Sequence, residues 1–529
     1  MISARLDALP SEEKALIHDA AVLGRVFSSD ALAALTVTQP DSISERLTAL
    51  VRKDVVQLEP RGSVDSDDEY AFVHVLVRDV AYDQIPRAER AERHRRAAEW
   101  MRLLSERPDN RVELIAYHYQ SALELFRAAG RVADDLVDPT VEYLALAGER
   151  AFQLHAHAEA IDYLQRALLL AEDSLRSSQI LEVLGMALQI TGRRADARLT
   201  FERALALTSP DDAVRVSRLY RLLAGTFTSE YSFADATSAY DRAQSALEPM
   251  AEDEERWREW SQAHIDRLTL LYWQQDPEEM QRVIEAVEPI VEHWGTAAQG
   301  AELLASHFLA RMIRERYVGS DETLELIRRF LSAREALGDP VDISRARFNV
   351  GFVLVGRGEL EDARAELESA LQTADRTGDA ILRCRCLAYL STVHRRRRDV
   401  RETKRAAEEA LEAATEMRMP EYVGMARANL AWVAWREQDL DETEVQGNAA
   451  LAGYADSVFG FFPWEWTARF PLLALALSRG RVAEAREHAQ AMVAETQQPL
   501  GGPLEAALSG RGRKSLEGAL ALAEAAGRL

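Results

Sequence analysis

The sequence predicts an all-α protein, a right-handed solenoid of long helical hairpins preceded by a small domain of helices and two strands. A pattern of glycine and alanine recurs along residues 141–490, and helical periodicity persists between its copies. Residues 1–100 do not follow this pattern. At 529 residues the chain is also too long for one ordinary core, so it should form several domains or a repeat array.

The amino-acid composition of the chain excludes or disfavours several classes of function. Hydrophobic residues make up 47% and charged residues 29%, which excludes general disorder. The net charge of −23 disfavours nucleic acid and anionic membranes, because both are bound mainly through positive charge. No apolar run approaches the roughly 20 residues that span a bilayer. With two cysteines and a charged N-terminal segment, the sequence predicts a cytoplasmic location without membrane contact.

Residues 1–100 predict three helices followed by a β-hairpin. The expected elements are helices at 11–23, after Ser29 and at 42–53, and strands at 55–58 and 70–73. This order is the winged-helix arrangement. Many winged helices bind DNA, but the polar loop between these strands carries Asp65, Asp67, Asp68 and Glu69, which would repel phosphate. A winged-helix transcriptional regulator is therefore the second alternative function.

The repeat is a spacing of small residues. The copies are Gly185, Gly192, Ala197, Phe201 and Ala204; Gly351, Gly358, Ala363, Leu367 and Ala370; and Gly148, Ala160, Leu164 and Ala167. Two antiparallel helices approach closely only where small residues face each other, here the first glycine and the alanine 12 positions later. The bulky residue 16 positions after the glycine fills the adjoining groove. The second glycine ends the first helix in a left-handed conformation.

This spacing resembles the tetratricopeptide repeat, TPR. Gly351, Ser391 and Ala431 stand 40 residues apart, whereas the usual TPR period is about 34. Such long repeats resemble those of large bacterial signalling ATPases. The expected organisation is a winged-helix domain (1–100), a helical connector (101–140), TPR-like repeats (141–490), and a C-terminal linker with a capping helix (491–529). Between about 250 and 345 the glycine and alanine pattern fades, which predicts degenerate repeats or a break in the solenoid.

An aromatic segment interrupts the late repeats. Residues 453–467 contain six aromatic residues, namely Tyr454, Phe459, Phe461, Phe462, Trp464 and Trp466. With two glycines and a proline, the segment predicts a long insertion between helices. Two uses are open: its rings fold back as a plug, or Phe461, Phe462, Trp464 and Trp466 bind a partner. Internal packing is the favoured interpretation, because exposing so much apolar surface invites aggregation.

The N-terminal region resembles a known class of signalling protein. Residues 5–27 and 70–101, above all Phe72-Val73-His74-Val75-Leu76-Val77-Arg78-Asp79-Val80-Ala81-Tyr82, are similar to the winged-helix segment of bacterial STAND-type ATPases. The likeness is strongest to actinobacterial regulators that combine an optional nucleotide cyclase, an ATPase, a winged helix and TPRs. In related ATPases a histidine at this place approaches the nucleotide phosphates, so the resemblance implies that role for His74.

The chain departs from that class in its chemistry. It contains no Gly-x-x-x-x-Gly-Lys-[Ser/Thr] phosphate loop; the nearest match, residues 510–515, lacks the Gly-Lys pair. ATP hydrolysis by this chain alone is not expected, and ATP or ADP would bind only with a separate ATPase domain. Because family members carry that domain ahead of the winged helix, we expect a truncated or split gene product, or an ATPase on another polypeptide.

Two further clusters, a pair of cysteines and a run of arginines, are candidate binding sites. Cys384 and Cys386 point about 200° apart on a helix, so they predict helix packing rather than a metal site. Arg395 to Arg398 fall at an inter-helix turn and predict a solvated turn. The alternatives for these arginines are a contact with an acidic partner or phosphate, or an internal contact.

These observations predict a non-catalytic arm of a bacterial signalling regulator, which binds a protein or peptide through the solenoid. The first alternative is a part of an ATPase or nucleotide-cyclase assembly whose phosphate-loop domain lies elsewhere. No catalytic residue, metal or cofactor is expected in the chain itself.

Overall fold

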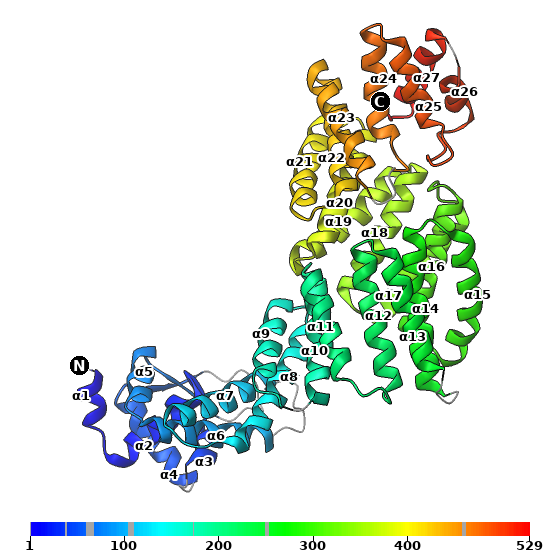
Figure 1. Ribbon diagram of the computed structural model, residues 1–529. Coiled ribbons are helices and arrows are strands. Elements are labelled where there is room, and N and C mark those ends of the chain that lie inside the picture. The colour runs from blue at the N-terminus through cyan, green and yellow to red at the C-terminus, as the bar shows by residue number, and fades with distance from the viewer. Residues whose placement is uncertain are drawn as a thin grey trace. The chain divides into compact units, whose positions relative to one another are not determined.

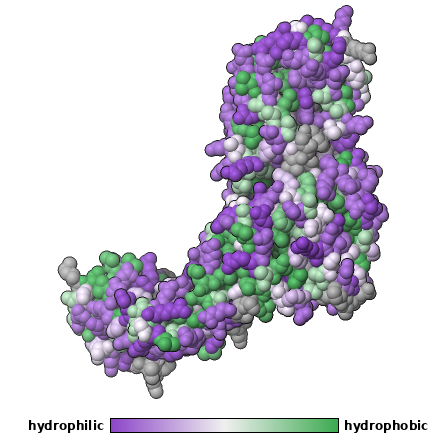
Figure 2. All heavy atoms as spheres, viewed as in Figure 1, coloured by the Kyte–Doolittle hydropathy of each residue, from purple (hydrophilic) through white to green (hydrophobic). Residues whose placement is uncertain are grey.

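The computed structural model describes residues 2–36, 40–59, 68–103, 111–172, 174–248, 253–457, 462–510 and 512–529. The chain divides into two compact units, Met1–Asp212 and Ala213–Leu529 (Figure 1). Among the described residues, no helix is long and apolar enough to cross a membrane. On the face shown in Figure 2, hydrophilic residues dominate and hydrophobic ones form scattered patches.

The first unit begins with helices packed on a small antiparallel sheet. Its elements are α1 (Ile2–Asp7), α2 (Ser11–Leu23), β1 (Val26–Ser28), α3 (Ser29–Leu35), α4 (Pro40–Arg52), β2 (Val56–Leu58) and β3 (Glu69–Phe72). The central strand β3 pairs with both others, with Val26 opposite Ala71 and Val56 opposite Phe72. The sequence predicted the hairpin of β2 and β3 but not β1, because three residues are too short for a periodic signal.

The rest of the first unit consists of helical hairpins. Its elements are α5 (Val75–Asp83), α6 (Arg87–Leu103), α7 (Val112–Ala128), the 3₁₀ turn η2 (Asp134–Leu136), α8 (Val137–Gln153), α9 (His157–Leu168), α10 (Ser174–Ile190) and α11 (Arg194–Leu207). Helix α6 packs on α7, α8 on α9, and α10 on α11.

The second unit is an array of helical hairpins. Its helices are α12 (Ala213–Ser229), α13 (Phe233–Leu247), α14 (Glu254–Trp273), α15 (Pro277–Trp294), α16 (Ala297–Arg314), α17 (Asp321–Leu337), α18 (Pro340–Arg357), α19 (Leu360–Thr377), α20 (Ala380–Arg396), α21 (Val400–Glu416), α22 (Pro420–Arg436), α23 (Leu440–Ala455), α24 (Trp466–Ser478), α25 (Val482–Met492), α26 (Gly502–Leu508) and α27 (Arg513–Ala525). Each hairpin packs on the next, and α12, α14 and α16, like α18, α20 and α22, form a row of first helices. The unit is therefore a TPR-like solenoid in which contacts run between neighbours.

Small residues form the seams within the hairpins. A Cβ atom added to Gly148 would lie 2.5 Å from Leu164, one on Gly185 would lie 2.4 Å from Phe201, and one on Gly351 would lie 2.7 Å from Leu367. The alanines Ala160, Ala197 and Ala363 are fully buried. The spacing of 12 and 16 positions thus places a small residue beside a small residue, with a bulky side chain covering both.

Four helices of the later repeats, α18, α20, α21 and α23, begin with an aspartate cap. The Asp339, Asp379, Asp399 and Asp439 side chains each accept hydrogen bonds from backbone N–H groups two or three residues further on. These bonds satisfy donors that a helix N-terminus otherwise leaves unpaired. Asp339 and Asp379 stand 40 residues apart, as do Asp399 and Asp439, which reflects the repeat period.

The array continues through the region where the glycine and alanine pattern fades. Helix α14 packs against α12, α13, α15 and α16. Larger apolar side chains replace the small-residue seam here, with Ile265, Leu268 and Ile284 buried in one cluster. Helical periodicity alone therefore suffices for the hairpins of this region, without the close approach that glycine permits.

The arginine run is a solvated turn only in part: Arg397 and Arg398 form the turn and are exposed, whereas Arg395 and Arg396 belong to α20, so the prediction was wrong for these two. Arg395 is completely buried and donates hydrogen bonds to the carbonyl oxygens of Thr467 and Arg528, both at 2.6 Å. Arg398 donates to the carbonyl of Glu524. The run makes the internal contact that the sequence left as an alternative, because it anchors the C-terminal helix α27 on the turn after α20.

Candidate binding pocket

A pocket lined mostly by aromatic side chains lies within the second unit. Its volume is about 80 Å³, and its lining residues are Tyr272, Trp273, Tyr317, Phe352, Tyr389, Glu421, Tyr422, Ser457, Phe462, Pro463 and Trp464. They come from α14, the turn after α16, α18, α20, α22 and the segment between α23 and α24. One water needs roughly 10–15 Å³ on this measure, so the pocket can hold a chemical group of several heavy atoms.

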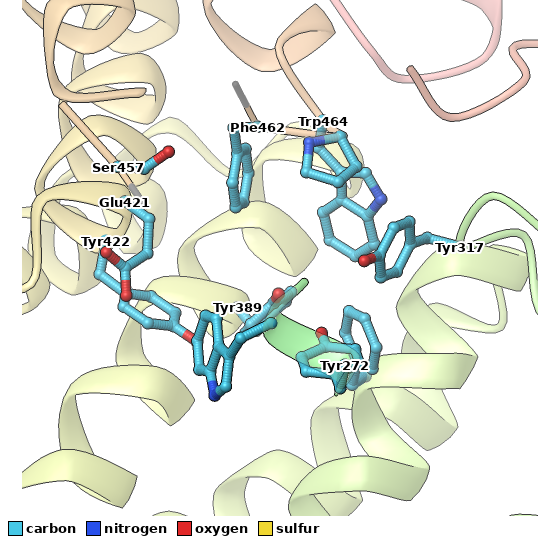
Figure 3. A pocket seen from close by; sticks show the side chains of 11 residues that line it. Tyr272, Tyr317, Tyr389, Glu421, Tyr422, Ser457, Phe462 and Trp464 are labelled. Atoms are coloured by element: carbon cyan, nitrogen blue, oxygen red, sulfur yellow. The ribbon is translucent and has the colours of Figure 1, made fainter. Parts of the chain in front are cut away.

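One wall of the pocket comes from the segment just before α24. Figure 3 shows Phe462 and Trp464 extending from this segment, with Tyr272 and Tyr389 opposite them. Glu421 and Tyr422 lie on one side and Tyr317 on the other. We call Phe462, Pro463 and Trp464 the roof of the pocket.

Ring contacts hold the roof in place. The Trp464 ring stacks on Phe352, with centroids 5.5 Å apart, and meets Tyr389 edge-on at 5.3 Å. Phe462 stacks on Tyr454 at 4.6 Å. Trp464 is only 3% exposed and Phe462 is half-buried. Offset and edge-to-face ring pairs stabilise such clusters beyond simple burial.

Gln498, from the segment after α25, connects the roof to Tyr317. The Gln498 backbone N–H donates to the carbonyl of Pro463 at 2.9 Å, and its side-chain amide donates to the carbonyl of Tyr317 at 2.7 Å. The Gln498 side-chain oxygen accepts a hydrogen bond from the Trp466 indole at 3.3 Å. Gln498 therefore links Pro463 of the roof to Tyr317, from which it is 181 positions away in sequence.

The electrostatics of the pocket centre on Glu421. Of the described lining residues it alone carries a formal charge, and its Oε2 atom is buried without a hydrogen-bond partner. Burial raises the pKa of this carboxyl, and the Arg385 guanidinium opposes that rise. The Arg385 guanidinium lies 4.2 Å from the centre of the Phe348 ring, and among the described residues no salt bridge links it to Glu421.

The pocket includes some of the aromatic residues singled out in the sequence. Phe462 and Trp464 line it, whereas Trp466 is buried beside it, under the Gln498 side chain. Phe461 lies outside the described residues. The other lining rings, such as Tyr272 and Tyr389, were not predicted. Most of them stand on helices of the array, where aromatic residues are typical of a core, and only their convergence marks a site.

The cysteines and His74 lie elsewhere. Cys384 and Cys386 are both buried in α20, and burial raises the pKa of each thiol to about 12. They therefore pack as small apolar residues. Among the described residues, no three His, Cys, Asp or Glu side chains are placed to hold a metal ion. His74 is the exposed residue that precedes the first turn of α5 in the first unit.

Comparison with known proteins gives structural neighbours only. No protein-family model matches the sequence, and no curated protein matches it. A STAND protein with a tetratricopeptide-repeat sensor from Pyrococcus horikoshii shares 17% identity at a TM-score of 0.39, over 92% of this chain and 63% of that one. This chain thus spans less than two thirds of that protein.

Two other structures show similar levels of likeness. A Rap protein in complex with competence and sporulation factor shares 12% identity at a TM-score of 0.42, covering 65% of this chain and 99% of that one. Yeast Tom70 shares 14% identity at a TM-score of 0.33, covering 83% and 96%. At these TM-scores the TPR-like assignment depends on the hairpin packing of the chain itself.

Proposed function

We propose that the chain is a non-catalytic protein-interaction arm that binds a peptide segment of a partner, with the aromatic pocket of the second unit as its anchor site. The observation that carries this proposal is the convergence of lining residues from successive hairpins on one cavity. Solenoids commonly bind extended partners along their stacked repeats, and buried aromatic anchors dominate the energy of such interfaces.

The lining favours binding over catalysis. It offers one carboxylate, Glu421, and one aliphatic hydroxyl, Ser457, beside its many rings. The Ser457 hydroxyl donates to the carbonyl of Tyr454 at 2.6 Å. A nucleophile needs an adjacent base, and general acid–base chemistry commonly needs a second titratable group, so this set suits recognition.

The wider role follows from the sequence resemblance. A STAND-like regulator would use the second unit as its sensor, and the winged-helix arrangement of the first unit would connect it to an effector. Signal transduction in a bacterial cytoplasm is part of this proposal.

A matched pair of tryptophans in α14 tests the binding site. Trp273 lines the pocket, whereas Trp257 lies in the same helix outside it, and both are half-buried. Peptides selected from a random displayed library by the full chain should bind with micromolar affinity, and Trp273→Ser should abolish that binding. Trp257→Ser should leave it unchanged. Equal loss in both variants would mean that the pocket is not the anchor.

A second candidate role, as part of an ATPase or cyclase assembly, has its own support. Val75 and Leu76, directly after His74, are 53% and 60% exposed. Exposed apolar residues at a helix start suit contact with another domain. By itself the chain should neither bind ATP tightly nor hydrolyse it. Calorimetry with ATP checks this, and micromolar binding lost in His74→Ala would show that the first unit holds nucleotide alone.

A further inference from the structure

The lining of the pocket combines aromatic faces with a single negative charge. Eight of the eleven described lining residues carry aromatic rings, and none of the eleven is a lysine, arginine or histidine. The faces of aromatic rings carry negative partial charge and attract cations, most strongly where water is excluded. A neutral apolar ligand would gain from the rings but would leave the carboxylate unused.

Glu421 is held without a counter-ion. Its Oε2 atom is buried without a hydrogen-bond partner, and the one hydrogen-bond donor that lowers the pKa of this carboxyl is the backbone N–H of Glu421 itself. An ionised carboxylate in such a place is costly unless a cation or donor approaches it. The groups that interact electrostatically with Glu421 are Arg385 and Cys384 on α20 and the neighbouring Tyr422. None of them supplies a direct ion pair.

The nearest cation is already engaged. The Arg385 guanidinium lies over the Phe348 ring, and Tyr422 interacts with it through a hydrogen bond. Arg385 is not among the lining residues. No cation of the described residues is therefore paired with Glu421, which lines the pocket.

We propose that the pocket binds an alkylammonium group, which the aromatic faces of Tyr272, Tyr389 and Trp464 surround and the Glu421 carboxylate neutralises. This inference rests on the proposed peptide-binding function. It specifies the chemical group of the peptide that enters the pocket, namely the ammonium group of a lysine side chain, free or methylated, or of an amino terminus. A cavity of about 80 Å³ admits such a group but not a large ring system.

Two small probes of matched shape test the charge preference. Tetramethylammonium and tert-butanol each give one methyl signal, so saturation-transfer NMR on one sample of the full chain, at constant chloride, compares them directly. Tetramethylammonium should bind about tenfold more tightly, as expected for a partly buried cation–π site with a carboxylate. Equal binding of the two probes would overturn the inference.

Two charge-removing variants make the test specific. Glu421→Gln should weaken tetramethylammonium binding about tenfold, whereas Glu412→Gln, at an exposed position of α21, should leave it unchanged. Circular dichroism checks that both variants fold. An unchanged affinity in Glu421→Gln, or tighter binding of acetate than of tetramethylammonium, would contradict the inference.

The pH dependence offers a second readout. Binding should weaken as the pH falls and Glu421 is protonated, while Arg385, Cys384 and Tyr422 keep their protonation states. No loss of binding on acidification would count against the role of Glu421. Library peptides that lack any cation yet depend on Trp273 would preserve the proposed function and refute the alkylammonium inference.

Discussion

Ala363 and Ala365 stand two positions apart in α19, and their surroundings are opposite. Ala363 is fully buried in the seam with α18, whereas Ala365 is exposed. The repeat spacing marked Ala363 in advance, because a seam residue must be small while its neighbours need not be. Glycine and alanine positions of this kind can be predicted from sequence, because the short distance between two consecutive helices requires small residues there.

Ala363→Leu should therefore destabilise the protein by about 1–3 kcal/mol, because the added atoms overpack a closed seam. Ala365→Leu should change the free energy of unfolding by less than about 0.5 kcal/mol, as exposed substitutions usually do. Urea titrations of both variants provide the measurement. Similar midpoints for the two would show that Ala363 does not face a neighbouring helix.

Arg395 illustrates what sequence could not reveal. A run of four arginines at a turn is normally solvated, yet this side chain is completely buried between the rings of Trp432 and Trp466. Burial lowers its pKa to about 9. Its partners are backbone carbonyls, which are present at every residue and leave no trace in composition.

Arg395→Met should cost about 3 kcal/mol or more, since the carbonyls of Thr467 and Arg528 would lose their donor. Arg401→Met, at a side chain that is 90% exposed, should be nearly neutral. Thermal melts followed by circular dichroism compare them. An Arg395 variant as stable as the Arg401 variant would show that these hydrogen bonds contribute nothing.

Helices α6 and α7 meet through two buried histidines. The Nδ1 atoms of His94 and His118 lie 2.8 Å apart, and the Tyr82 hydroxyl is hydrogen-bonded to Nε2 of His94 at 2.9 Å. Burial lowers the pKa of His94 to about 3 and that of His118 to about 4. Both rings are therefore neutral at pH 7, and the Nδ1–H of one ring donates a hydrogen bond to Nδ1 of the other.

This pair should make the first unit sensitive to acid. The folded-state pKa values lie below the ordinary value of 6.5, so the stability they contribute is complete above about pH 6.5 and is lost as the pH falls towards about 4 for His118 and about 3 for His94. His118→Leu should reduce the loss of unfolding free energy on acidification by up to about 3 kcal/mol. Hydrogen exchange across α6 and α7, corrected for intrinsic rates, measures this free energy at neutral and acidic pH. His74→Gln, at an exposed site, should retain the full acid sensitivity.

At the level of elements, the sequence predicted helical hairpins along the repeats but missed an element that has no periodic pattern. The hairpins with glycine and alanine seams, such as α10 with α11 and α18 with α19, follow from the spacing. Strand β1 does not, because three residues carry too little signal. The array across α14 to α17 could be read only as helical, since its seams use larger side chains.

For the whole chain, the pocket could be predicted only in part. Phe462 and Trp464 were recognisable because aromatic residues crowd into a segment with proline and glycine. Tyr272, Tyr389 and Glu421 were not, because they are far apart in sequence and meet only when successive hairpins stack. The link from Gln498 to Tyr317 likewise requires the folded array.

Site-specific photo-crosslinking tests peptide binding at the pocket most directly. A benzophenone side chain placed at position 273 should crosslink to a library-selected peptide, whereas the same group at position 257, in the same helix outside the pocket, should not. Excess tetramethylammonium should reduce the crosslink at 273. Retained peptide binding with no crosslink from 273, or equal crosslinking from both positions, would contradict the assignment of the pocket as the anchor site.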